Sequence, residues 1–162
     1  MPDVAVTIRR GFPPERASAL WRWLNTPRSP NFDDFGPKTT HEFAVELAQR
    51  LKYELTWAIE SDGEIVGYAG AVRISPVTAQ FHGIVIAPDH RRNGIGPQAV
   101  QLIWDELRAD GVTKMLAYIF ADNSDVAHMF TSLGWRREGL LPGMTRRGGM
   151  PLASLIFGME AT

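Results

Sequence analysis

The basic, glycine-containing stretch Arg91-Arg92-Asn93-Gly94-Ile95-Gly96 is the part of this sequence whose residue types most directly indicate chemistry. Glycine lets a backbone approach a ligand closely, and arginine can bind a phosphate group through two parallel hydrogen bonds. A helix is expected directly after the stretch, with Pro97 at its first position, and the first N–H groups of a helix have no partner within it. These amides and the helix dipole favour an anion, so the stretch predicts a site for a phosphate or pyrophosphate group.

Two elements must hold this stretch in place. The β-branched run Ile84-Val85-Ile86 before it is typical of a buried strand, which Pro88 would end. The residues after it repeat apolar side chains at the i, i+3, i+4 and i+7 positions of a helix, and Gly111 would end that helix. The apolar positions of this helix are Val100, Ile103, Trp104 and Leu107.

The remaining elements follow from the same kinds of pattern. A Thr39-x-x-Glu42 capping box opens one helix, and Asp122 or Asn123 caps another. Residues 26–38 and 142–151 are rich in proline, glycine and charged side chains and are expected to be loops. The order β-α-α-β-β-β-α-β-α-β-β predicts an α/β fold, a mixed sheet with helices on both faces. The strands are expected at residues 4–10, 56–60, 64–74, 80–86, 113–120, 135–141 and 152–159.

Length and composition limit what this protein can be. The 162 residues suit one domain, residues 1–162. The 17 Lys+Arg against 18 Asp+Glu give a formal charge of −1, which supplies no general field for nucleic acid. Cysteine is absent, and the four histidines show no paired metal-ligand spacing, so we expect neither thiol chemistry nor a metal. We find no signal peptide and no apolar run of membrane-spanning length, and therefore expect a cytoplasmic protein.

The glycine stretch has three interpretations. It could be a plain strand-to-helix turn with solvated arginines. The Gly94-x-Gly96-x-x-Ala99 pattern could instead open a dinucleotide-binding fold, although only one strand–helix unit follows it. In the third interpretation, Arg91-x-x-Gly94-x-Gly96 resembles the [Q/R]-x-x-G-x-[G/A] coenzyme A loop of the GNAT superfamily of N-acetyltransferases.

Two further features resemble the same superfamily. Residues 123–135 are similar to its N-x-x-x-A-x-x-[L/Y] segment followed by LG[F/W]. The order of elements resembles the GNAT fold along nearly the whole chain, which implies a mixed, mostly antiparallel sheet flanked by helices. The chain is therefore identified as a GNAT N-acetyltransferase with acetyl-CoA as its co-substrate.

The resemblance implies how coenzyme A would be held. The backbone amides from Arg92 to Gly96 would bind the pyrophosphate, and the pantetheine arm would pair with the strand before the loop, where two central strands splay apart. The Ile84 N–H would polarise the thioester carbonyl. Asn123 would lie near the cofactor and could also cap its helix. The implied cofactor contacts are Ile84, Val85, Ile86, Arg91, Arg92, Asn93, Gly94, Ile95, Gly96, Asn123 and Phe130.

The resemblance also points to a general base. Bases in relatives often lie eleven or nine positions before the first loop residue, which are Gln80 and His82 here, and only the histidine can accept a proton. Strand alternation would put these two residues on one face with Ile84 and Ile86. We therefore expect His82 to be the general base, the alternative being a hydrogen-bonded core histidine.

The usual general acid is missing. Phe130 occupies the position of the tyrosine that protonates the departing thiolate in many relatives, so it is expected to be a core residue. Water or Tyr118 could protonate the thiolate instead, unless Tyr118 is also core. The departure also permits a second hypothesis, a non-catalytic acyl-CoA-binding or regulatory domain. A nucleotide-binding oxidoreductase is the third.

The sequence leaves the acceptor open. Asp33 and Asp34 could attract a cationic amine, whereas Arg146 and Arg147 could bind an acidic acceptor, and either pair could be solvated loop charge. The predicted reaction is direct attack by a primary amine, on a small molecule or a protein, within a ternary complex. No membrane partner is expected, and a homodimer is allowed. Trp21, Trp23, Phe32 and Phe35 could line an aromatic acceptor pocket.

Overall fold

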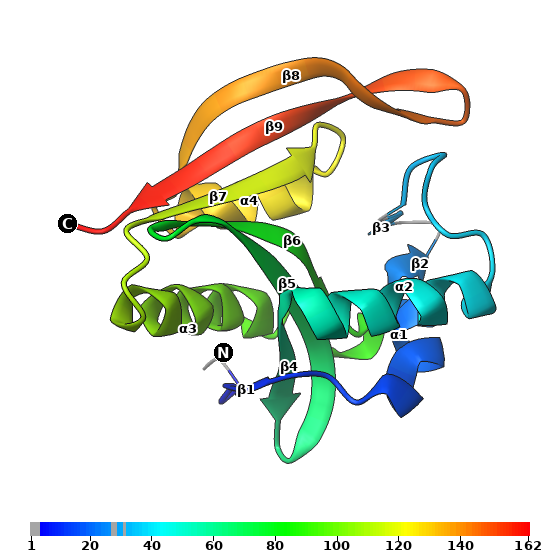
Figure 1. The fold of residues 1–162 in the computed structure, drawn as a ribbon, viewed down its shortest axis with the longest axis horizontal. Coiled ribbons are helices and arrows are strands. Elements are labelled where there is room, and N and C mark those ends of the chain that lie inside the picture. The colour runs from blue at the N-terminus through cyan, green and yellow to red at the C-terminus, as the bar shows by residue number, and fades with distance from the viewer. Residues whose placement is uncertain (1–3, 27–28, 31) are drawn as a thin grey trace.

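The computed structural model describes residues 4–26, 29–30 and 32–162, which form a seven-stranded sheet with helices on both faces (Figure 1). The main strands are β1 (Thr7–Arg10), β4 (Leu55–Ser61), β5 (Glu64–Ser75), β6 (Thr78–Ile86), β7 (Lys114–Phe120), β8 (Arg136–Arg147) and β9 (Met150–Glu160). The helices are α1 (Ala17–Leu24), α2 (Thr40–Tyr53), α3 (Ile95–Ala109) and α4 (Ser124–Ser132). The strand order is β1-β4-β5-β6-β7-β9-β8, with β6 and β7 parallel and the other neighbours antiparallel. The predicted α/β order is confirmed.

The core is divided between the two faces of the sheet. Residues of α3 and α4, including Trp104 and Phe130, are buried in one cluster with strand residues such as Ala69. Residues of α1 and α2, including Leu20, are buried in a second cluster with Tyr68. Ala69 and Tyr68 are consecutive on β5 and face opposite clusters, as strand alternation requires.

The C-terminal hairpin is longer than the sequence predicts. Strands β8 and β9 are joined by Gly148 and Gly149, whose φ values of 59° and 77° suit a tight hairpin turn that glycine enters without strain. Pro142 and Gly143 lie at a register shift in β8, an edge strand where proline is tolerated. The prediction of a loop over residues 142–151 is therefore wrong.

Other boundaries differ by smaller amounts. Helix α3 begins at Ile95, so Pro97 is its third residue and not its first. The missing N–H of Pro97 still belongs to the first turn, where no intrahelical partner exists. The expected loop 26–38 contains part of a two-stranded ribbon of β2 (Asn25–Thr26) and β3 (Ser29–Pro30), while its residues 27–28 and 31 lie outside the described ranges.

The predicted helix caps are confirmed. The Glu42 N–H donates to Thr39 Oγ1 at 3.1 Å, and the Val126 N–H donates to Asn123 Oδ1 at 3.4 Å. In a capping box the Glu42 side chain would accept from the Thr39 N–H. Here its Oε2 instead accepts from the N–H of the preceding residue, Lys38, at 2.6 Å.

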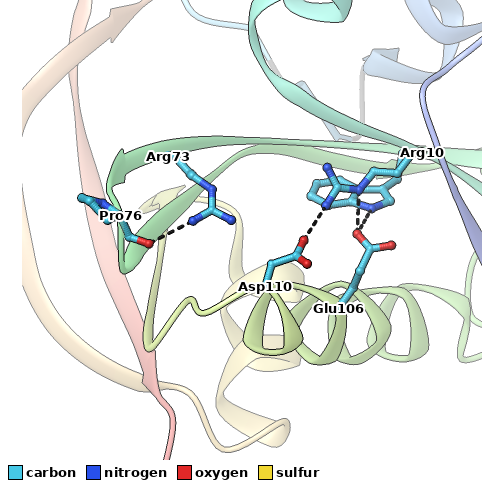
Figure 2. Close-up of polar contacts among 6 residues, drawn as sticks. Arg10, Arg73, Pro76, Glu106 and Asp110 are labelled. Carbon is cyan, nitrogen blue, oxygen red and sulfur yellow. Dashed lines mark hydrogen bonds and ion pairs between the residues drawn. The ribbon is translucent and has the colours of Figure 1, made fainter.

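Helix α3 is fastened to the sheet near its C-terminal end. Arg10 of β1 donates to Glu106 Oε2 at 2.7 Å and to Asp110 Oδ2 at 3.3 Å, as Figure 2 shows. The indole N–H of Trp57 donates to the same Glu106 oxygen at 2.8 Å. These contacts from two strands fix the direction of α3, and therefore the position of the glycine loop where the helix begins.

Candidate active site

A β-bulge at His82 shapes the centre of the sheet. Phe81 and Gly83, on either side of it, pair with the consecutive β5 residues Ala71 and Gly70, so His82 has no partner of its own on β5. A bulge leaves one residue unpaired and bends its strand. His82, the candidate base, is therefore the β6 residue that does not pair with β5.

The bulge also reverses the alternation of β6. Phe81 and Ile84 belong to the cluster on the α3 side, although three positions separate them, and Val85 belongs to the cluster on the α1–α2 side. An inserted residue shifts the two-residue period by one. The prediction of one shared face of the sheet for Gln80, His82, Ile84 and Ile86 is therefore wrong.

Strands β6 and β7 separate beyond the bulge. Their parallel pairing ends at Phe81 and Ala117, although both strands continue. The Ala87 N–H donates to a β5 carbonyl at 2.8 Å, so alternation along the strand turns the backbone groups of Ile84 away from β5 and toward the opening. The splayed pair therefore leaves a backbone edge of β6 open at Ile84.

The loop of residues 91–96 leads from this strand into α3. Arg92 and Gly94 have φ values of 65° and 74°, and Gly94 is the N-cap residue without a side-chain cap. A positive φ is unusual for arginine and is typical of loops that a ligand or a tight turn constrains. A Cβ at Gly96 would lie 3.2 Å from Met129 Sδ, so a glycine there lets α3 start close against α4. The loop thus offers uncapped helix amides of the kind that bind anions.

Arg91 binds the protein's own backbone. Its Nε donates to Ile86 O at 2.9 Å and its Nη2 to Trp23 O at 3.2 Å. Burial lowers the pKa of this guanidinium below its ordinary value. The side chain joins the end of β6 to the end of α1, and Arg92 is left as the exposed cation of the loop.

A cavity of about 450 Å³ lies between the splayed strands, α2 and residues 32–37. It brings together the predicted site residues on β6, β7 and α4 with two charged residues of α2 that the sequence analysis did not single out. The predicted residues in its lining are His82, Ile84, Tyr118, Asn123 and Phe130, and the additional charged residues are Glu46 and Arg50.

His82 is paired with a carboxylate. Its Nδ1 lies 2.7 Å from Oε1 of Glu54, the residue that directly follows α2. A carboxylate beside Nδ1 favours the tautomer with the proton on Nδ1 and the lone pair on Nε2. The His82 side chain is 46% exposed and lines the cavity, so the interpretation as a core histidine is wrong.

The missed charges follow a simple spacing. Glu46, Arg50 and Glu54 recur every four residues, and residues four apart share one face of a helix. Arg50 Nη2 donates to Glu46 Oε1 at 3.0 Å, and the Arg50 side chain is 16% exposed. The apolar residues Phe43, Leu47 and Leu51 recur at the same spacing, so the pattern that indicates the buried side of α2 also indicates this polar side.

The other predicted residues have mixed environments. Phe130 is 1% exposed and packs edge-on against Trp135 with ring centroids 4.8 Å apart, so its expected role in the core is confirmed. Tyr118 is 37% exposed on the cavity wall, and so the core alternative is wrong for it. Asn123 both caps α4 and lines the cavity.

The acidic pair of the 32–38 segment binds the C-terminal hairpin. Asp33 accepts a hydrogen bond from the Thr145 hydroxyl. Asp34 accepts from the N–H groups of Gly148 at 2.7 Å and Gly149 at 2.9 Å, and these bonds lower its pKa. The idea that Asp33 and Asp34 are solvated loop charges is therefore wrong, because both bind the hairpin, and Asp33 also lines the cavity.

The described residues show no group of three or more His, Asp or Glu side chains that could hold a metal ion. Within the same residues, we find no helix with the length and apolar character needed to cross a membrane.

The known proteins that resemble this chain are acetyltransferases. Residues 17–135 match the family model described as the acetyltransferase (GNAT) family. A mycothiol acetyltransferase of Corynebacterium glutamicum is 29% identical in an alignment of 133 residues; the match covers 76% of this chain but only 43% of that protein. An L-methionine sulfoximine/L-methionine sulfone acetyltransferase of Pseudomonas paraeruginosa is 28% identical in an alignment of 122 residues, and the match covers 67% of this chain and 71% of that protein.

Solved structures share the fold. The Salmonella typhimurium protein yncA, solved with its cofactor acetyl-CoA, matches with a TM-score of 0.73 over 96% of this chain and 94% of that chain. Its sequence identity of 20% makes this a likeness of fold.

Proposed function

Because the chain belongs to the GNAT family of acetyltransferases, we propose that it transfers the acetyl group of acetyl-CoA to a primary amine by direct attack in a ternary complex. The observation that carries the proposal is one cavity that contains both the open edge of β6 at Ile84 and the side chain of His82. An acyl donor bound along that edge would present its thioester next to a candidate base.

The donor site is built from backbone groups. An extended pantetheine arm can hydrogen-bond to an open strand edge as an added strand does. Uncapped amides at the start of α3 favour a pyrophosphate, and the exposed side chain of Arg92 adds positive charge. Arg91 supports this site by holding the loop, since its guanidinium binds the Ile86 and Trp23 carbonyls.

The transfer requires one bond to form and one to break. The amine nitrogen attacks the thioester carbonyl carbon, a C–N bond forms, and the C–S bond breaks to release the coenzyme A thiolate. An ammonium acceptor gives up two protons: His82 Nε2 passes one to solvent, and the thiolate takes up the equivalent of the other. The Ile84 N–H stabilises the negative charge that develops on the carbonyl oxygen.

The role of each group in the reaction depends on the charge that it carries after proton transfer. Glu54 stabilises the His82 imidazolium that forms when the amine loses its proton. A thiol has a pKa of ~8.5, so the thiolate is a tolerable leaving group and water or Tyr118 can protonate it afterwards. The buried ring of Phe130 has no proton to give.

The acceptor belongs to a class that the cavity can admit. A volume of about 450 Å³ suits a small molecule better than a folded protein surface. One relative is named for its action on L-methionine sulfoximine and L-methionine sulfone, which are small amines. We therefore take a small primary amine as the acceptor.

Amine-dependent release of free thiol tests the proposal. The purified chain is incubated with acetyl-CoA and a panel of amines that includes L-methionine sulfone, a polyamine and a lysine peptide. Thiol release that requires both substrates, with acetylated amine detected by mass spectrometry, is the expected result. Binding of coenzyme A in a calorimeter without turnover on any amine would instead identify a non-catalytic acyl-CoA-binding domain.

A further inference from the structure

A small recess opens beside His82 on the side of the sheet that α1 and α2 cover. Its volume is about 100 Å³, and its walls combine apolar side chains with hydrogen-bond donors. The two spaces share a wall, made by Phe32, Arg50, His82, Gly83 and Ile84. The recess has Leu24 and Tyr68 as its further lining residues.

Two donors at this recess have no acceptor. The Tyr68 hydroxyl and Arg50 Nε are both buried, and neither has a partner with hydrogen-bond geometry in the part of the chain that the structure describes, although the two side chains are close enough to shift each other's pKa. Tyr68 is 2% exposed, and a Cβ at Gly83 would lie 3.9 Å from Arg50 Nη1, which places the guanidinium over the bulged strand. Buried donors without partners are rare, because they lose their bonds to water and gain nothing in return.

Both donors keep their protons at neutral pH. Burial raises the pKa of Tyr68 above its ordinary value, and this exceeds the opposite effect of the neighbouring Arg50. Burial acts to lower the pKa of Arg50, but the nearby Glu46 and Tyr68 raise it above its ordinary value overall. The recess therefore presents a neutral hydroxyl and the unpaired Nε–H of a guanidinium whose Nη2 already donates to Glu46, and these two donors suit an acceptor such as a carboxylate.

Unpaired acceptors lie on the same helix face. Glu46 Oε2 and Glu54 Oε2 are buried and also lack a hydrogen-bond partner among the described residues. Carboxylate oxygens suit an ammonium group. Arg50 lies between Glu46 on α2 and Glu54, the residue that directly follows the helix, so donors for an anion and acceptors for a cation both occur in the segment 46–54.

We propose that the recess binds the carboxylate of the acceptor, so that the acceptor is a small amino acid whose amine lies at His82. This inference rests on the proposed acetyl transfer and deepens it by naming the class of acceptor. Arg50 and Tyr68 select the carboxylate, and Glu46 and Glu54 help to hold the amine before it is deprotonated. An amine of similar shape without a carboxylate leaves both donors unpaired and is a poorer acceptor.

Matched acceptors test this selection. A panel of L-amino acids is assayed, each beside its methyl ester and the amine that remains when its carboxyl group is removed. The free acid should exceed its two analogues in kcat/KM by at least about tenfold, since a site built for a polar group discriminates against analogues that lack it. Equal or better kcat/KM for the analogues would overturn the inference.

Two variants locate the effect. Arg50→Met should lower kcat/KM for the amino acids by about 10- to 100-fold, mainly through KM, and should change it little for the decarboxylated amines. Tyr68→Phe should act in the same direction with a smaller effect. Arg73→Met is the matched control, because Arg73 donates to Pro76 O at 2.9 Å at the end of the β5–β6 hairpin, as Figure 2 shows. Equal losses for both acceptor classes in Arg50→Met would refute the role of Arg50.

A binding measurement separates this inference from acetyl transfer. Acetate is titrated into the protein while the amide NMR signals of Gly83 and Ile84 are followed. These signals should shift in the wild-type protein and in Arg73→Met but not in Arg50→Met, and equal coenzyme A affinity in all three would show that each is folded. Acetate binding without any turnover would count against the proposed function alone, whereas an absence of shifts in the wild type would remove the carboxylate site.

Discussion

Glu54 and His82 meet at 2.7 Å, although they belong to different elements and are 28 residues apart in the chain. Glu54 directly follows α2, and His82 is the bulge residue of β6, which has no partner on β5. The Glu54 side chain is 15% exposed, and its second oxygen, Oε2, is buried without a partner in the described chain. The pair therefore combines a poorly solvated carboxylate with an imidazole that the cavity can reach.

Glu54→Gln should remove the preference of His82 for the tautomer that is protonated at Nδ1. We expect a 10- to 100-fold lower kcat, about the range for losing an orienting charge, with a smaller change in KM. The ¹⁵N NMR signals of His82 should show a lower fraction protonated at Nδ1. Glu54→Asp keeps the charge and should recover part of the rate, while Glu64→Gln, at the exposed start of β5, is the control. Unaltered tautomer populations in Glu54→Gln would contradict the assignment.

His82→Ala should slow the reaction in a pH-dependent way. At neutral pH we expect a loss of about 10²- to 10³-fold, because little of the acceptor amine is neutral and no base removes its proton. The loss should shrink at high pH, where the amine is already neutral. Rates measured from pH 6 to 10, with the exposed His41→Ala variant as control, test this expectation. A profile parallel to that of the wild type would exclude His82 as the base.

Arg92→Gly should separate ligand binding from folding. Arg92 has a φ of 65°, which glycine adopts more easily, so the melting temperature should stay the same or rise. Loss of the exposed cation should weaken coenzyme A binding by about three- to tenfold at low salt, and by less at high salt because the attraction is screened. Calorimetry at two salt concentrations measures this, and Arg92→Lys, which keeps the charge, should bind nearly as the wild type. Unchanged affinity at low salt in Arg92→Gly would show that Arg92 does not contact the cofactor.

Acid should open the contact between Asp34 and the C-terminal hairpin. Hydrogen bonds from Gly149 and Gly148 hold the pKa of Asp34 below its ordinary value of 3.8. A lowered folded-state pKa means that this contribution is complete above about pH 4 and is lost as the pH falls through the lower folded-state value. The amide signals of Gly148 and Gly149 should therefore titrate below pH 3.8 in the wild type but not in Asp34→Asn. Asp62→Asn, in a distant turn, should leave that titration in place, and titration in Asp34→Asn would disprove the link.

Local sequence patterns determined much of this protein. A glycine loop before a helix, a threonine cap and the apolar period of α3 each involve residues within a few positions of one another, so their conformations follow from short-range sterics and hydrogen bonds. The order of elements and the conformation of the glycine loop could be predicted for that reason. The spacing of Glu46, Arg50 and Glu54 is equally evident in the sequence, but the sequence does not show which residues of the sheet these side chains contact.

Tertiary structure decided the features that depend on register and on distant partners. The bulge at His82 arises from the pairing of β6 with β5, and one extra residue reversed the faces that alternation predicted. The contact of Glu54 with His82 joins different elements, and that of Asp34 with Gly148 spans 114 residues. Such contacts are set by how whole elements pack, which no short window of sequence contains. The sequence by itself thus determined the fold and the candidate anion-binding loop, and packing alone decided which side chains surround the candidate base.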